Sequence, residues 1–172
     1  MKIADCTLQQ APEILAIFNH EIAHTTAIYD SKPRNLDWME AWFEAKRKGN
    51  YPIIGAFTES GSLAGFATFG PFRSWPGYKY SVEHSVYVDK EYRGKGLGKG
   101  LLQTLLQKAR QQDYHMIIGG IDSSNTPSIR LHCSVGFVHC ASIKQAGFKF
   151  GHWLDLEFYQ LILDTPSDPK EA

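Results

Sequence analysis

The stretch Arg93-Gly94-Lys95-Gly96-Leu97-Gly98 decides the fold of this chain, because of the segments on either side of it. The apolar, β-prone segment 80–88 precedes it, and leucines at helix spacing follow it as far as residue 112. A glycine-rich turn between a strand and a helix points several backbone N–H groups at one spot, at the positive end of the helix dipole. The sequence therefore predicts a site for phosphate oxygens at residues 93–99.

Two common phosphate-binding motifs do not fit the spacing of these glycines. A P-loop has Ser or Thr after its Gly-Lys pair, whereas Lys95 and Lys99 are each followed by glycine. The dinucleotide motif G-x-G-x-x-G would need its third glycine where the chain has a lysine or a leucine. The pattern that fits is R-x-x-G-x-G, formed by Arg93, Gly96 and Gly98.

Three spaced motifs resemble one enzyme superfamily. The R-x-x-G-x-G loop resembles the pyrophosphate loop of the Gcn5-related N-acetyltransferases, which bind acetyl-CoA. Segment 125–137 begins with Asn and ends with Gly-Phe, and it resembles the second half of the acetyltransferase core. With segments 83–88 and 147–155, the likeness narrows to the phosphinothricin and methionine sulfoximine N-acetyltransferases, and it extends over nearly the whole chain. The resemblance implies acetyl-CoA as co-substrate and an amine as acceptor.

The composition fits a single domain over residues 1–172, with a polar, frayed tail from about residue 165. Lys plus Arg equals Asp plus Glu at 18 each, so no net charge attracts nucleic acid or an anionic membrane. The chain has no apolar run of the roughly 18 residues that a membrane span needs, and no signal-peptide pattern at its start. Three cysteines form no paired framework, so we expect a cytoplasmic protein.

Two His-Cys pairs, at 132–133 and 139–140, suggest a metal site at first sight. The first pair falls on a predicted helix and the second on a predicted strand, and no C-x-x-C motif accompanies them. Adjacent side chains also point in different directions. We therefore expect no metal.

The hydrophobic periodicity predicts an α/β domain of the acetyltransferase type, with a mixed, mostly antiparallel sheet and helices on both faces. Helices are expected at 10–23, at 36–48, after the glycine-rich turn up to 112, and in a short segment after Asn125. Strands are expected at 51–57, 62–69, 80–88, 114–121, 137–143 and 153–163. Residues 71–78, rich in proline, glycine and aromatics, are expected to form a loop.

Alternation along strand 80–88 puts Glu83 and Tyr87 on one face and His84 on the other. After Asn125, helix spacing puts Asn125, Ser128 and His132 on a common face. Parallel strands that splay apart are a feature of the resembled family. With that splay, Glu83 and His132 would approach one cleft from opposite sides.

The catalytic candidates are Glu83 and His132. A carboxylate in a partly desolvated cleft has a raised pKa, which makes it a better base toward an ammonium group. Glu83 is therefore the expected general base, directly or through a water molecule. By resemblance, His132 occupies the position where many members of the superfamily carry a tyrosine that acts as general acid. Histidine can act in either direction near pH 7, so the direction of its proton transfer stays open.

The resemblance also assigns the binding residues. The acetyl-CoA contacts would come from strand backbone, the loop and two polar residues, namely Val86, Tyr87, Val88, Arg93, Gly94, Lys95, Gly96, Leu97, Gly98, Lys99, Asn125 and Ser134. The acceptor would be bound by Arg73, Ser74, Trp75, Glu83, His84 and Ser85. An arginine can bind an α-carboxylate in a bidentate pair, although a solvated loop arginine fits Arg73 equally well.

The expected reaction is acetylation of the α-amine of a small amino-acid analogue, such as methionine sulfoximine, methionine sulfone or phosphinothricin. The alternatives are a polyamine, an aminoglycoside or a protein N-terminus as acceptor, or an acyl-CoA-binding module without turnover. The resemblance further implies a homodimer, in which residues 149–155 are candidates to complete the acceptor pocket.

Overall fold

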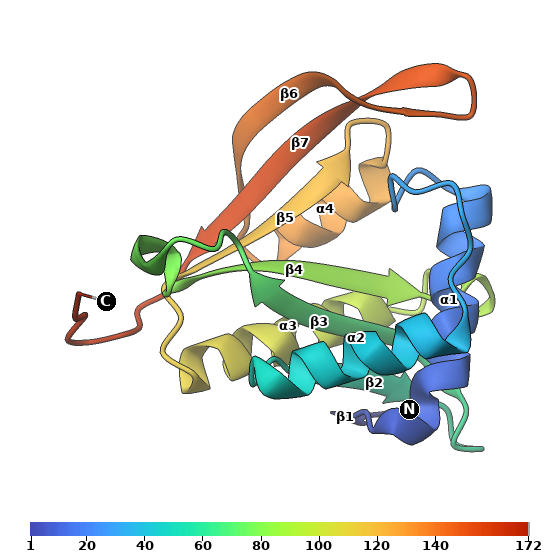
Figure 1. Cartoon of the computed structure of the whole chain (residues 1–172), viewed down its shortest axis with the longest axis horizontal. Helices are drawn as coiled ribbons and strands as arrows, with labels where there is room; N and C mark the ends of the chain where they lie inside the picture. Colours follow the sequence, from blue (N-terminus) through green and yellow to red (C-terminus); the bar gives the residue numbers. More distant parts are fainter. Residues whose placement is uncertain (172) are drawn as a thin grey trace.

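A seven-stranded mixed sheet forms the centre of the molecule in a computed structural model that describes residues 1–171 (Figure 1). The strand order is β1-β2-β3-β4-β5-β7-β6, and neighbouring strands are antiparallel except for the parallel pair β4 and β5. The strands are β1 (Lys2–Asp5), β2 (Ile53–Phe57), β3 (Leu63–Pro71), β4 (Ser81–Val88), β5 (Met116–Asp122), β6 (Val138–Lys149) and β7 (His152–Ile162).

Helices cover both faces of the sheet. The α-helices in the described part of the chain are α1 (Ala11–His24), α2 (Leu36–Lys48), α3 (Leu97–Gln111) and α4 (Thr126–Ser134). Short 3-10 helices are formed by Leu8–Gln10, Pro76–Tyr78 and Lys90–Tyr92. Side chains of α1 and α2 pack on one face, and those of α3 and α4 pack on the other. The predicted fold class, a mostly antiparallel sheet between two helical layers, is thereby confirmed.

Local chemistry sets the ends of the helices. The Asn35 side chain accepts a hydrogen bond from the Trp38 N–H at 2.9 Å, and Gly49 follows the last turn, so α2 has the predicted bounds. Gly96 stands directly before α3 in the left-handed region, with φ of +79°. Five apolar side chains of α3, from Leu101 to Ala109, are buried against the sheet.

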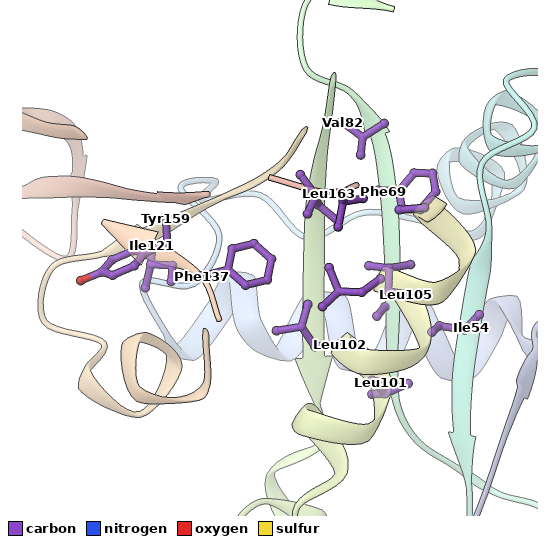
Figure 2. Close-up of a cluster of buried hydrophobic side chains, with 14 of the residues drawn as sticks. Ile54, Phe69, Val82, Leu101, Leu102, Leu105, Ile121, Phe137, Tyr159 and Leu163 are labelled. Carbon is purple, nitrogen blue, oxygen red and sulfur yellow. The ribbon is translucent and has the colours of Figure 1, made fainter. Parts of the chain in front are cut away.

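The central strands are buried on both faces, so alternate residues enter two different cores. Phe66 of β3 packs toward α1 and α2, whereas Ala67 and Phe69 pack toward α3. Figure 2 shows the second core, where Leu101, Leu102 and Leu105 point from α3 toward the strands. Both cores hold β4 in place, and β4 carries several of the candidate site residues.

Some elements differ from the sequence-based expectation. Strand β1 was not predicted, and β6 continues to Lys149, beyond the expected end at residue 143. Residues 163–171 form no helix or strand, yet Lys79 Nζ donates to the Glu171 carbonyl at 2.8 Å and the Lys170 N–H donates to Tyr80 Oη at 3.0 Å. Ala172, the last residue of the expected frayed tail, lies outside the described residues.

Candidate active site

Strands β4 and β5 part from each other in the middle of the sheet. They pair only where Ser81–Glu83 lie beside Met116–Ile118, and beyond these three residue pairs β4 runs on to Val88 and β5 to Asp122. The strands diverge there, as Figure 1 shows. The backbone of β4 after Glu83 therefore has no strand partner on this side, although β3 pairs with it on the other. Unpaired backbone N–H and C=O groups of this kind can bind an extended, amide-bearing ligand.

A cleft of about 770 Å³ opens from this splay toward the glycine-rich loop. It contains all the residues expected to contact acetyl-CoA except Lys95 and Ser134, namely Val86, Tyr87, Val88, Arg93, Gly94, Gly96, Leu97, Gly98, Lys99 and Asn125. The helix face predicted to carry Asn125, Ser128 and His132 also lies at the splay, where all three residues line a second, smaller cavity.

The loop has the shape that a pyrophosphate needs. Gly94 and Gly96 both have positive φ, of +76° and +79°, in a conformation that other residues adopt only with strain. At Gly98 a Cβ atom would lie 3.0 Å from Leu131 Cδ2, so a side chain there would press on α4. The loop leads into the N-terminus of α3, where free N–H groups and the helix dipole favour an anion, and Lys99 adds positive charge. These residues fit the pyrophosphate of acetyl-CoA.

The Arg93 side chain braces the loop instead of pointing freely into the cleft. Its Nε donates to the Val88 carbonyl at 3.0 Å, and its guanidinium pairs with the Glu21 carboxylate of α1. Glu21 is almost fully buried, and it also accepts a hydrogen bond from the Thr25 hydroxyl at 2.9 Å. Glu21 is a site residue that the sequence does not predict, because nothing in its local pattern separates it from other glutamates on a helix.

Two residues of the expected acetyl-CoA set have other partners. Lys95 Nζ donates to the Glu91 carbonyl at 3.2 Å and lies 5.0 Å from the centre of the Tyr92 ring. The Ser134 hydroxyl donates to the Leu131 carbonyl at 2.7 Å, and Ser134 is exposed at the end of α4. The structure does not place either residue in the cleft.

Glu83 is the last residue of β4 that pairs with β5, so it lies where the splay begins. Burial raises the pKa of its carboxyl, and the positive charge of Arg73 opposes that shift. On β5, a Cβ atom at Gly120 would lie 3.7 Å from Glu83 Oε1, an ordinary contact distance, so the carboxylate lies beside this glycine. Tyr87 shares the face of Glu83, and burial raises its pKa to about 12, so its hydroxyl stays protonated.

His84 and His132 lie together on the opposite face of the sheet. Their rings stack with centres 5.0 Å apart and planes 14° apart, and both side chains are buried. His132 Nδ1 lies 2.7 Å from the Ser128 carbonyl. The sequence placed His84 among the acceptor-binding residues, but its side chain contacts His132 and Phe137 on the α4 side of the sheet.

The other expected acceptor residues are spread over the loop before β4. Arg73, Ser74 and Trp75 are exposed, and the Arg73 guanidinium lies 4.3 Å from the centre of the Phe72 ring. Arg73 is near enough to Glu83 to affect its pKa. Neither of these two residues lines the cleft, and Ser74 and Trp75 do not line it either. Ser85 lines the smaller cavity at the splay.

The described residues, 1–171, contain no group of three or more His, Cys, Asp or Glu side chains that could hold a metal ion. His139 instead places its Nε2 2.6 Å from Glu157 Oε2. Within the same range no helix is both long enough and apolar enough to cross a membrane.

Residues 14–137 match the acetyltransferase (GNAT) family. The chain belongs to this family. A GNAT relative from Salmonella typhimurium, named L-methionine sulfoximine/L-methionine sulfone acetyltransferase, is 45% identical over 96% of this chain and 94% of its own length. A protein of the same name from Pseudomonas paraeruginosa is also 45% identical, over 97% of this chain and 98% of its own.

Solved GNAT structures share the fold over nearly the full chain. The structure of a phosphinothricin acetyltransferase from Sinorhizobium meliloti in complex with acetyl-CoA has a TM-score of 0.94 and 30% identity. The match covers 99% of this chain and 92% of the Sinorhizobium meliloti chain. The predicted family resemblance is therefore confirmed.

Proposed function

We propose that this GNAT protein transfers the acetyl group of acetyl-CoA to the α-amine of small amino-acid analogues, namely methionine sulfoximine, methionine sulfone and phosphinothricin. The observation that carries the proposal is the splay of β4 and β5, which begins at Glu83 and opens into a cleft lined by the glycine-rich loop. The names of the relatives from Salmonella and Pseudomonas support this class of acceptor.

The cleft and the residues beside it each have a task in this reaction. Acetyl-CoA supplies an acetyl group activated as a thioester. The loop N–H groups and Lys99 bind its pyrophosphate, and the unpaired backbone of residues 86–88 holds its amide-bearing arm. Glu83 takes a proton from the acceptor ammonium, and its raised pKa makes it a stronger base than an ordinary glutamate. Arg73, close to Glu83, binds the acceptor carboxylate.

The decisive experiment measures CoA release from acetyl-CoA with methionine sulfoximine, methionine sulfone, phosphinothricin, spermidine and an aminoglycoside. Wild type and Glu83→Gln are assayed in parallel, with acetyl-CoA binding measured separately. We expect turnover on the three amino-acid analogues and its loss in the variant. Turnover confined to spermidine or the aminoglycoside would contradict the proposed acceptor. Acetyl-CoA binding without turnover on any amine in the panel would contradict the proposed transfer.

We also propose a homodimer that acts in the cytoplasm. Strand β6 is the edge of the sheet, and the hairpin of β6 and β7 exposes Phe148, Phe150 and Trp153, each with more than half of its surface accessible. Exposed aromatic side chains gathered on one hairpin are typical of an interface. The three free cysteines within the described residues suit a reducing compartment.

A further inference from the structure

A second, smaller cavity of about 70 Å³ lies at the splay, next to the stacked histidines. His84 of β4, Gly119 and Asp122 of β5, and His132 of α4 all line it. A water molecule needs roughly 10–15 Å³ when a cavity is measured in this way, so the space suffices for a few waters. Tyr87 and Asn125 line both this cavity and the acetyl-CoA cleft, so the two spaces are neighbours.

Three residues that line the cavity carry buried polar atoms that have no partner within the protein. They are both ring nitrogens of His84, Nε2 of His132 and Oδ2 of Asp122. Each of these residues is more than nine-tenths buried, with exposed fractions of 6%, 2% and 4%. An unpartnered polar atom in a protein interior costs free energy, and such atoms are usually satisfied by ordered water. Ordered water in this cavity would satisfy these atoms, and the volume of the cavity suits it.

The hydrogen bond to Ser128 defines the protonation of His132. A carbonyl oxygen can only accept, so the hydrogen between the Ser128 carbonyl and His132 Nδ1 must be on Nδ1. Burial lowers the pKa of His132, which keeps its ring neutral near pH 7. A neutral ring with hydrogen on Nδ1 presents a lone pair at Nε2. In the resting protein, His132 is thus a proton acceptor at Nε2.

The Nε2 atoms of His84 and His132 lie close together beside Gly119. A Cβ atom at Gly119 would lie 2.7 Å from His84 Nε2 and 3.5 Å from His132 Nε2, so both atoms converge over this glycine. Phe137 packs edge-on against both rings, with centres 5.2 Å away. Asp122 is the charged group among the residues that line this cavity, and Glu83 points to the other face of β4.

We propose that His84 is a positioning residue, which binds cavity water and holds the Nε2 lone pair of His132 ready to receive a proton on a route separate from Glu83. The inference rests on the proposed function. In acetyl transfer a C–N bond forms as the C–S bond breaks, and the ammonium nitrogen loses two protons. Glu83 takes the first proton and passes it to solvent. His132 Nε2 takes the second through the cavity water and gives it to the departing sulfur.

The position of the pair explains why the second proton does not remain on His132. Burial disfavours an imidazolium in this cavity, and the neighbouring ring lowers the pKa of His84 further, so the pair does not hold two charges. A proton received at Nε2 is therefore readily released to the thiolate. His84 itself touches neither the acceptor nor the sulfur in this scheme.

The first test needs no variant and no turnover. Imidazole ¹⁵N NMR of the wild-type protein reports which ring nitrogen of each histidine carries hydrogen, and a high-resolution structure reports water in the cavity. We expect His132 neutral with hydrogen on Nδ1 at pH 7, His84 neutral, and at least one ordered water within hydrogen-bond distance of both Nε2 atoms. An imidazolium at His132, hydrogen on its Nε2, or an empty cavity would overturn the proposal.

The second test uses two substitutions of His84 and a matched control. His84→Phe keeps a stacked ring but removes both nitrogens, whereas His84→Gln keeps a group that can bind water. The control is His115→Phe at an exposed histidine before β5. Because acid–base groups contribute about 10²–10⁴-fold and His84 acts indirectly, we expect His84→Phe to lower kcat roughly 10- to 100-fold. His84→Gln should recover most of kcat, His115→Phe should match wild type, and no variant should change the acetyl-CoA affinity.

The kinetic outcomes separate positioning from binding. A raised acceptor KM with unchanged kcat in His84→Phe would return His84 to acceptor binding and overturn the proposal, as would an unchanged kcat and KM. If His84→Phe does not fold, the NMR and structural measurements on wild type decide. If wild type acetylates none of the amines, the proposed function fails on its own, while the state of His132 and the cavity water are still measured.

Discussion

At the scale of single residues, burial disfavours ionisation of the Glu83 carboxyl. Its pKa is raised in the folded protein, so the folded state binds the proton more tightly than the unfolded chain does. The ionised carboxylate therefore destabilises the fold, increasingly as pH rises above 4.5, the ordinary glutamate value. Glu83→Gln should lower kcat about 10²- to 10⁴-fold and slightly raise the Tm at pH 7. Steady-state kinetics and calorimetry check this, and a fully active variant would contradict it.

The stacked histidines give the protein a sensitivity to acid. The pKa values of His84 and His132 are lowered below the ordinary 6.5, so the unfolded chain binds protons that the folded state resists. The stability that they contribute is present above pH 6.5 and decreases as pH falls below it. Urea unfolding from pH 7.5 to 5 should show this decrease, and it should be smaller in His84→Phe than in wild type. Equal slopes in both proteins would argue against the effect.

The Arg93 and Glu21 pair joins the loop to α1. Arg93→Ala should leave the Glu21 carboxylate buried without its cation, which costs about 1–3 kcal/mol of unfolding free energy. It should also weaken acetyl-CoA binding roughly tenfold, or about 1.4 kcal/mol, because the loop loses its brace. Lys95→Ala is the matched control, since Lys95 makes no contact in the cleft. Calorimetric titration with acetyl-CoA measures both variants, and equal affinities would contradict the bracing role.

Much of this site could be predicted from local spacing, but its long-range contacts could not. The glycine loop and the common face of Asn125, Ser128 and His132 follow from turn and helix geometry, because neighbours in the chain determine both. The contact of His84 with His132 depends on the missing Cβ of Gly119, on a third element. Arg93 and Glu21 are 72 residues apart, so no periodicity could reveal their pair.

At the scale of elements, β3 carries a glycine where a side chain would meet the backbone of β4. A Cβ atom at Gly65 would lie 2.7 Å from the Tyr87 carbonyl, which is backbone and cannot rotate away. Gly65→Ala should therefore cost about 1–3 kcal/mol of unfolding free energy and displace the end of β4 that lines the cleft. Gly77→Ala is the control, since its Cβ would meet nothing within 4 Å. Denaturant unfolding compares the two, and equal stabilities would contradict the close approach.

The strands that the sequence did not predict correctly lack a clear alternation of buried and exposed residues. Strand β1 has four residues and pairs only with β2, so no alternation could reveal it. Strand β6 is exposed along nearly its whole length, and its register with β7 shifts twice, between 139 and 141 and between 143 and 147. Bulges of this kind break the period of two. By contrast, α2 had a capping Asn35 and a terminal glycine, and its bounds were predicted correctly.

At the scale of the whole molecule, the hairpin of β6 and β7 is the proposed dimer surface. The double variant Phe148→Ser/Trp153→Ser removes the two aromatic rings that pack on each other there, with centres 5.1 Å apart and both exposed. We expect it to convert the dimer to a monomer in sedimentation velocity, because aromatic anchors supply much of the energy of an interface. Trp75→Ser, at an exposed residue outside the hairpin, should leave the dimer intact. A wild-type protein that sediments as a monomer would contradict the proposal.

The short pairing of β4 with β5 also has a metabolic consequence. Strands β1–β4 come from residues 2–88 and strands β5–β7 from residues 116–162, so the sheet has two parts. Only three residue pairs, all between β4 and β5, join these two parts as a strand ladder. A ligand in the cleft contacts β4 on one side and α4 with the turn after β5 on the other, so its binding free energy stabilises the two parts of the sheet against separation. Unfolded molecules in a cell are removed by proteases. The cellular lifetime of this protein should therefore rise and fall with the supply of its own acetyl donor.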